Sequence, residues 1–186
     1  MKIAYKAFNK DLTCTMGRGR FQYEVGKWYE EPEANCVRNG FHCAENPLDC
    51  LTYYPDMDSS RYWAVLIDGD IDENGSDTKI SATKMKLFKE MSLEQFVAES
   101  VMYMLNHPLR PTNYRVSTSN DMAEEHDKFI IVRNEEPAAA GSRIGQYIGL
   151  VKDCEDHVEG TLLLVDGETY KPGVFYDLKG EETDAG

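Results

Sequence analysis

The segment that most constrains the fold of this chain is residues 40–55, with the sequence GFHCAENPLDCLTYYP. It places two thiols, an imidazole, two carboxylates and a Tyr-Tyr pair between a glycine and a proline. Asn46 can cap a helix that starts at Pro47, because asparagine accepts hydrogen bonds from backbone amides and proline needs no donor in the first turn. The run therefore predicts a strand that turns into a short helix near residues 47–54. It would form either a functional site or a tightly packed corner of the core.

Short apolar runs, separated by turn residues, make up most of the remaining chain. Alternation of apolar and polar residues with period 2 is typical of strands with one buried face. This pattern predicts strands at 3–8, 21–25, 36–43, 62–67, 78–88, 129–132, 144–151, 161–165 and 174–178. In residues 78–88 the side chains expected to face inward are Ile80, Ala82, Met85, Leu87 and Phe88.

Residues 92–106 carry the clearest helical pattern, with apolar residues at helical spacing, a capping pair at Ser92 and Gln95, and Pro108 beyond the end. We expect an α+β fold in which strand-dominated mixed sheets accompany one long amphipathic helix, at about 92–106, and the short helix near 47–54. The alternative is two β-rich lobes joined by that helix.

These patterns divide the chain into three expected parts. We expect a β-rich module at 1–91 and a helix plus a second β-rich module at 92–180, with a long polar loop at 107–128. The acidic tail at 181–186 is expected to be disordered, because it has few apolar residues to bury.

The chain of 186 residues has 20 basic and 33 acidic residues, a formal charge of −13. Phosphate backbones repel such a chain, so we expect no direct binding to nucleic acid and instead a basic protein partner. Solubility alone is a plainer explanation of the acidity.

No apolar run approaches the ~20 residues of a membrane span. The N-terminal residues have no signal-peptide pattern, and the five cysteines lack a disulfide-domain spacing, so we expect a cytoplasmic protein and no membrane partner.

Two segments resemble metal sites only in part. Cys36, Cys43 and Cys50 lie seven residues apart, whereas zinc ligands usually come in closer pairs, so we interpret them as core thiols. Residues 70–75 match the first half of a calcium loop, but position eight is Asp77 and position twelve is Ser81, so an acidic hairpin turn is expected there. No motif places a catalytic nucleophile, and we predict no metal, cofactor or catalytic residue.

Several segments together resemble an uncharacterised family of phage- and prophage-encoded proteins. They are YKAF at 5–8, FQYEVGK at 21–27, the run 40–55 and VDGETYKP at 165–172. Phage accessory proteins that are small and acidic often block a host defence enzyme. The resemblance implies a non-enzymatic accessory protein that binds and inhibits a basic, nucleic-acid-processing host protein, such as an RNA-guided CRISPR nuclease. A virion or other structural accessory protein is a further possibility.

The residues expected to bind that partner are surface acids, chosen for their charge density. They are Asp68, Asp70, Asp72, Glu73, Asp77, Glu124, Glu125 and Asp127.

A second resemblance is to ADP-ribosyltransferase-like folds, which use NAD. Its basis is the opening strand with Tyr5 and Phe8, the GFHCA strand with His42, the following Tyr53-Tyr54, and a Ser-Thr-Ser at 117–119. The resemblance implies a split sheet around a cleft beside Tyr5, His42 and Tyr53. Two features depart from that pattern: Lys6 stands where an arginine is expected, and no Glu-x-Glu follows the Ser-Thr-Ser.

Overall fold

A computed structural model describes residues 1–15, 19–36, 38–73 and 78–185. The chain divides into two compact units, Met1–Ser92 and Leu93–Gly186. The position of one unit relative to the other is not determined.

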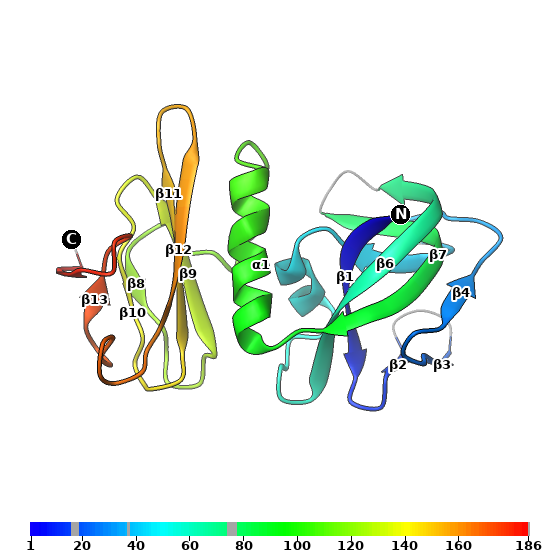
Figure 1. The fold of residues 1–186 in the computed structure, drawn as a ribbon, viewed down its shortest axis with the longest axis horizontal. Coiled ribbons are helices and arrows are strands. Elements are labelled where there is room, and N and C mark those ends of the chain that lie inside the picture. Colours follow the sequence, from blue (N-terminus) through cyan, green and yellow to red (C-terminus); the bar gives the residue numbers. More distant parts are fainter. Residues whose placement is uncertain (16–18, 37, 74–77, 186) are drawn as a thin grey trace. The chain divides into compact units, whose positions relative to one another are not determined.

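A small closed sheet forms the N-terminal unit (Figure 1). Each neighbouring pair is antiparallel: β1 pairs with β6, β6 with β7, β7 with β5, and β5 again with β1. The four strands therefore close into a ring. Their bounds are Lys2–Asn9 for β1, Phe41–Ala44 for β5, Ser60–Glu73 for β6 and Lys79–Glu90 for β7.

Three short strands accompany this ring. β4 (Trp28–Glu30) pairs with the Lys84–Lys86 part of β7, and β2 (Thr13–Cys14) pairs with β3 (Phe21–Gln22). The register between β6 and β7 shifts at Ala64/Val65 and again between Asp68 and Ile71. Such irregularities bend a strand and increase its twist, which allows so few strands to close a ring.

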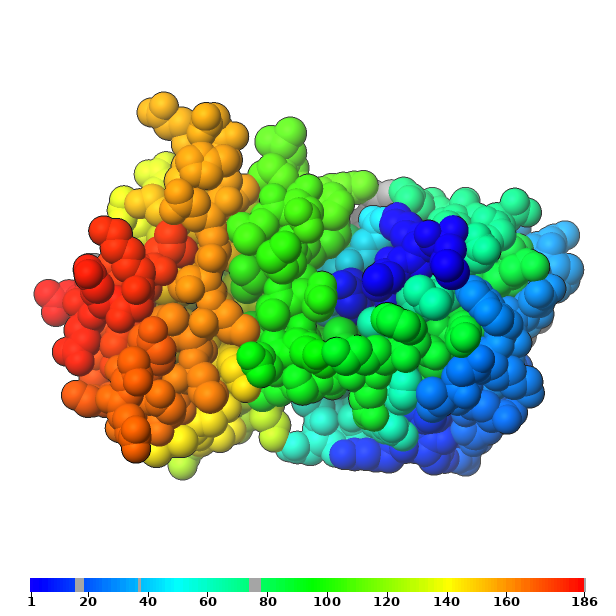
Figure 2. All heavy atoms as spheres, viewed as in Figure 1, coloured from blue at the N-terminus to red at the C-terminus, as the bar shows by residue number. Residues whose placement is uncertain are grey.

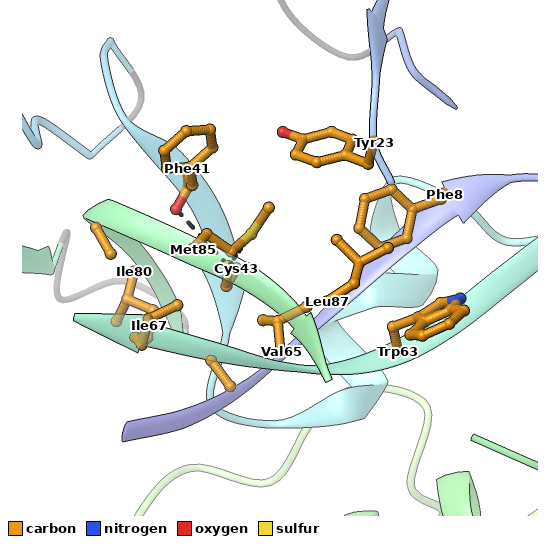
Figure 3. Packing of buried hydrophobic residues seen from close by; sticks show 12 residues of the cluster. Phe8, Tyr23, Phe41, Cys43, Trp63, Val65, Ile67, Ile80, Met85 and Leu87 are labelled. Carbon is orange, nitrogen blue, oxygen red and sulfur yellow. Dashed lines mark hydrogen bonds between the residues drawn. The ribbon is translucent and has the colours of Figure 1, made fainter. Parts of the chain in front are cut away.

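The core of this unit comes from strands and one loop (Figure 3). Trp63, Val65 and Ile67 alternate along β6 and point inward, as period 2 requires. On β7 the inward residues are Ile80, Ala82, Met85 and Leu87, as predicted. Phe88 was expected inside and is 54% exposed, because it follows Leu87 directly and so faces the opposite side.

The run 40–55 folds into β5 and a 3₁₀ helix, η1 (Pro47–Thr52). The Asn46 side chain accepts a hydrogen bond from the Leu48 amide at 3.1 Å, and Pro47 begins the helix, as the sequence predicts. Leu48, Cys50 and Leu51 are buried.

In the C-terminal unit, α1 packs on a three-stranded sheet of order β12-β11-β9. β9 lies parallel to β11, and β12 is antiparallel to it. Val101 of α1 approaches the sheet closely at Gly160, where an added Cβ would lie 2.9 Å from its side chain. A four-stranded sheet of order β14-β13-β10-β8 completes the unit. The bounds are Leu93–Asn106 (α1), Asp121–Met122 (β8), Phe129–Asn134 (β9), Ala139–Ala140 (β10), Tyr147–Asp153 (β11), Val158–Leu164 (β12), Phe175–Tyr176 (β13) and Glu182–Thr183 (β14).

The α+β class with one long amphipathic helix, expected from the sequence, is wrong. Within the described ranges the structure has fourteen strands and two helices, one of which is the six-residue η1. α1 occupies the segment with helical spacing, but it has only 14 residues. Strands prevail because β-branched and aromatic residues at period 2 supply the core of the N-terminal unit, which has a small barrel-like sheet and no long helix.

Two further segments differ from expectation. β8 lies within 107–128, the region expected to be a long polar loop, whereas β9 confirms the strand expected at 129–132. The tail expected to be disordered contains β14, whose Glu182 and Thr183 pair with β13. Backbone pairing orders this tail even though it buries little apolar surface.

Gly40→Ala should destabilise the N-terminal unit more than Gly26→Ala. Both glycines have positive φ, which costs a residue with a Cβ about 1–2 kcal/mol. At Gly40 the added Cβ would also lie 2.4 Å from Ser81 Oγ and 3.0 Å from the Ala82 carbonyl, whereas at Gly26 nothing lies within 4 Å. Overpacking should add about 1–3 kcal/mol at Gly40. Denaturant unfolding of both variants measures the difference, and equal losses would contradict this packing.

Candidate functional site

A cavity of about 450 Å³ lies in the N-terminal unit, beside β5 and η1. Ligand pockets typically have volumes of roughly 300–1,000 Å³. The walls come from β1, β5, η1 and the segment around β3, and the run 40–55 supplies much of the lining. Tyr5, His42 and Tyr53, which the transferase resemblance placed beside a cleft, all line this cavity.

Lys6 is the most unusual residue of the lining. Its side chain starts from the middle of β1 and the residue is only 8% exposed. Nζ donates a hydrogen bond of 2.6 Å to the His42 carbonyl and lies 5.7 Å from the centre of the Phe8 ring. Among the described residues, no carboxylate forms an ion pair with Lys6. Burial of a charge without a counter-charge is unfavourable, so this ammonium group would gain from an anion in the cavity.

The electrostatics of His42 agree with a positive potential there. Burial lowers the pKa of His42, and the charges of Lys6 and Lys79 lower it further. The backbone hydrogen bond with Gly40 acts in the opposite direction. The lining also includes Glu31 and Asp49, but neither is among the causes of this shift in pKa. Asp49 Oδ2 accepts hydrogen bonds from the Thr78 hydroxyl and, at 3.1 Å, from the Thr78 amide.

Exposed aromatic rings also line the cavity. Tyr53 is 37% exposed, and Lys79 Nζ lies 4.7 Å from its ring centre. Phe21 is 43% exposed and contacts Tyr23 with a centroid distance of 4.7 Å. Exposed rings beside a cationic group suit a ligand with a planar ring and a negative charge.

Two thiols of the lining, Cys43 and Cys50, are poor nucleophiles. Burial raises the pKa of Cys43 to about 11, and it also raises the pKa of Cys50. The thiolate is the reactive form, so both groups are largely unreactive at neutral pH. Cys36, Cys43 and Cys50 do not form a metal cluster in the described part of the chain. The core thiols predicted from the sequence are correct for Cys43 and Cys50, while Cys36 is only half-buried.

The acids predicted to bind a partner do not form one set. Asp68, Asp70, Asp72 and Glu73 lie on β6 in the N-terminal unit, whereas residues 124–127 belong to the C-terminal unit. Asp77 lies outside the described residues, as do residues 74–76 of the calcium-like loop.

Some of these acids have local partners. Asp68 pairs with the N-terminal ammonium group at 3.0 Å, and Asp72 accepts a hydrogen bond of 2.6 Å from the Cys36 amide. Glu124 and Asp127 lie 3.4 and 3.7 Å from the ring nitrogens of His126. Glu125 is exposed. The acids of β6 and the acids at 124–127 therefore form two separate groups, one in each unit.

Further residues of the transferase resemblance are not in this cavity. Ser117 bridges to Val132, so the Ser-Thr-Ser of the resemblance belongs to the C-terminal unit. The N-terminal sheet closes through the pairing of β6 with β7 and is not split. From the sequence, Lys6 was noted only as standing where the transferase resemblance expects an arginine. Its place between Ala4, Ala7 and Phe8 in an apolar strand was the further signal that it belongs to a site.

One group of side chains in the C-terminal unit could hold a metal ion. Within the described residues it is the only set of three or more metal-ligating side chains close together, and it consists of Cys154, His157 and Glu159. The Asp156 carboxylate raises the pKa of His157, and the Glu159 carboxylate adds to this effect.

The N-terminal unit places the chain in a class of proteins that have a small closed β-sheet with a ligand-sized cavity beside it. Residues 2–99 match the family described as Domain of unknown function (DUF7666). This match covers more than half of the chain, which therefore belongs to that family. Neither the curated proteins nor the solved structures compared with the chain gave a match. In the described ranges, neither helix has the length and apolarity needed to cross a membrane.

The pKa of His42 should lie below its usual value of 6.5 in the folded protein. The unfolded state then takes up a proton at a higher pH than the folded state. His42 therefore contributes stability that is present above about pH 6.5 and is lost as the pH falls through its folded pKa. Two-dimensional NMR of the imidazole resonances measures this shift. His157, whose pKa is raised, should titrate above 6.5 in the same spectra and serves as the internal control. A His42 midpoint above 6.5 would contradict the burial of the imidazole together with the effect of Lys6 and Lys79.

Proposed function

We propose that the N-terminal unit binds a small anionic molecule with a planar ring, of the nucleotide class, in the cavity beside Lys6. The observation that carries the proposal is the buried ammonium group of Lys6, which has no ion-pair partner among the described residues. A phosphate group would supply that counter-charge, since hydrogen bonds between ionised groups are short and strong.

The rings at the cavity support the second half of the proposal. Tyr53 and Phe21 are exposed where they line it, and a nucleobase could stack on either one. The cavity of about 450 Å³ is large enough for a mononucleotide. NAD belongs among the ligands to test because Tyr5, His42 and Tyr53 line the cavity, as in the resemblance to ADP-ribosyltransferase-like folds.

We confine this proposal to binding. Cys43 is held protonated, and Ser117 with its neighbours belongs to the other unit. The thiols also favour a reducing compartment, and we place the protein in the cytoplasm of a bacterial host on the resemblance to phage proteins.

Lys6→Gln should weaken the binding of AMP and NAD by about tenfold to a hundredfold, because a hydrogen bond to a charged group contributes about 1.5–3 kcal/mol. Glutamine keeps a donor for the His42 carbonyl, which protects the fold. The control is Lys2→Gln, an exposed lysine of the same strand that does not line the cavity. Isothermal titration calorimetry measures affinity for AMP, NAD, adenosine and inorganic phosphate. AMP should bind more tightly than adenosine or phosphate alone.

Two results would overturn the binding proposal: no affinity for any of the four probes, or equal affinity in Lys6→Gln and the parent chain. Incubation with labelled NAD and lysate separates binding from turnover. Transfer of the label to protein would show an enzyme, whereas binding without transfer agrees with the proposal.

A second candidate function is supported by the outer end of β6. Asp70 and Glu73 are exposed, and neither carboxylate has an ion pair among the described residues. We propose that this segment binds a basic host protein that processes nucleic acid, such as an RNA-guided nuclease, and inhibits it. The phage-family resemblance and the charge of −13 support this choice of partner.

Asp70→Lys combined with Glu73→Lys should abolish retention of the chain on an immobilised, guide-loaded RNA-guided nuclease. The matched control is Glu124→Lys with Glu125→Lys, which makes the same change of charge in the other unit. Retention of the parent chain should also fall as salt rises, because exposed charges are screened. Retention that does not change with salt concentration would contradict a specific role for β6. An equal loss of retention in both double variants would also contradict it.

A further inference from the structure

The turn between β11 and β12 brings three metal-ligating residue types together. Asp153 pairs with Val158 in the register of the hairpin, so residues 154–157 form the turn. The Cys154 amide donates a hydrogen bond of 2.9 Å to the His157 carbonyl, which closes it. This hairpin projects from its unit in the space-filling view (Figure 2, orange).

The register also puts the three side chains on one face. Cys154 and His157 lie opposite each other as the next pair beyond Asp153 and Val158, and Glu159 follows His157 by two residues. Side chains two residues apart on a strand share a face. The ligand atoms of the three residues all lie within 4.8 Å of one another.

We propose that Cys154, His157 and Glu159 bind a divalent transition-metal ion, with zinc as the best fit and one position left for water. A thiolate, an imidazole and a carboxylate are all zinc ligands, whereas Mg²⁺ and Ca²⁺ prefer oxygen alone. Zinc bonds of about 2.0–2.3 Å place neighbouring ligand atoms roughly 3–4 Å apart. Small rotations of exposed side chains suffice to reach that spacing from the observed one.

The surroundings of His157 match those of a metal-bound histidine. Its Nδ1 lies 2.6 Å from Asp156 Oδ1, and its Nε2 lies 3.1 Å from Glu159 Oε1. A metal would take Nε2, on the side of Glu159, while Asp156 would hold the proton on Nδ1. A carboxylate behind a ligating histidine fixes the orientation of the ring and strengthens the ligand.

Nearby positive charge does not oppose a cation here. Lys152 pairs with Glu159 in the strand register, but its Nζ binds Glu136 Oε1 at 2.8 Å. Arg133 pairs with Asp153 at 2.6 Å. Glu155 and Asp156 add negative charge to the turn itself. The surroundings of His126 differ from those of His157. Glu124 and Asp127 lie near His126, but this second group contains no thiol.

Titration of the metal-free full chain with Zn²⁺, in competition with a chromophoric chelator, should show one site. Cys154→Ser and His157→Ala should each weaken zinc binding by about a hundredfold, and Asp156→Asn by about tenfold. Glu124→Gln with His126→Ala is the control and should leave the affinity unchanged. With Co²⁺ as the probe, thiolate-to-cobalt charge-transfer absorption should appear and should be missing in Cys154→Ser.

Circular dichroism and melting of each variant check that the exposed turn tolerates these changes. The absence of zinc binding by the parent chain would overturn the proposal. Undiminished zinc binding by Cys154→Ser would also overturn it. The same holds if the cobalt charge-transfer absorption persists in Cys154→Ser and disappears in Cys36→Ser. The proposal is independent of the N-terminal cavity, because all of its ligands belong to the other unit.

Discussion

The pairing of β6 with β7 is the constraint on which the N-terminal unit depends. These two long strands run together with two shifts of register, and the bends allow β1 and β5 to close the ring between their other edges. Closure buries Trp63, Val65 and Ile67 against Met85 and Leu87 without any long helix. It also places β5 and η1 so that side chains of the run 40–55 border a cavity.

The cavity contains positive charge that the net charge of the chain does not indicate. The protein as a whole carries a formal charge of −13, yet Lys6 and Lys79 both lower the pKa of His42. A buried ammonium group has less solvation than an exposed one, so its need for a counter-charge is greater. The local field of the cavity therefore says more about a small ligand than the net charge does, while the net charge bears on the choice of a protein partner.

Local signals predicted several elements well. The Asn46 cap before Pro47 and the inward residues of β7 up to Leu87 depend on neighbours in the sequence. The expected fold class was wrong because the single helical segment is outnumbered by short strands, whose pairing builds the sheets of both units. The grouping of Cys154, His157 and Glu159 was not predicted, although the sequence shows a cysteine and a histidine three residues apart in a turn. The register of β11 with β12 is what places Glu159 beside Cys154 and His157.

The sequence by itself determined where the longer strands and the capped turn at Asn46 form, because the period of apolar residues and the chemistry of caps act over a few residues. Tertiary structure decided what those elements enclose. The cavity needs residues from β1, β3, β5 and η1 at once, and the burial of Lys6 arises only when β1 lies between β5 and β6. Strand pairing between distant segments creates such environments, and periodicity along the chain carries no information about which segments pair.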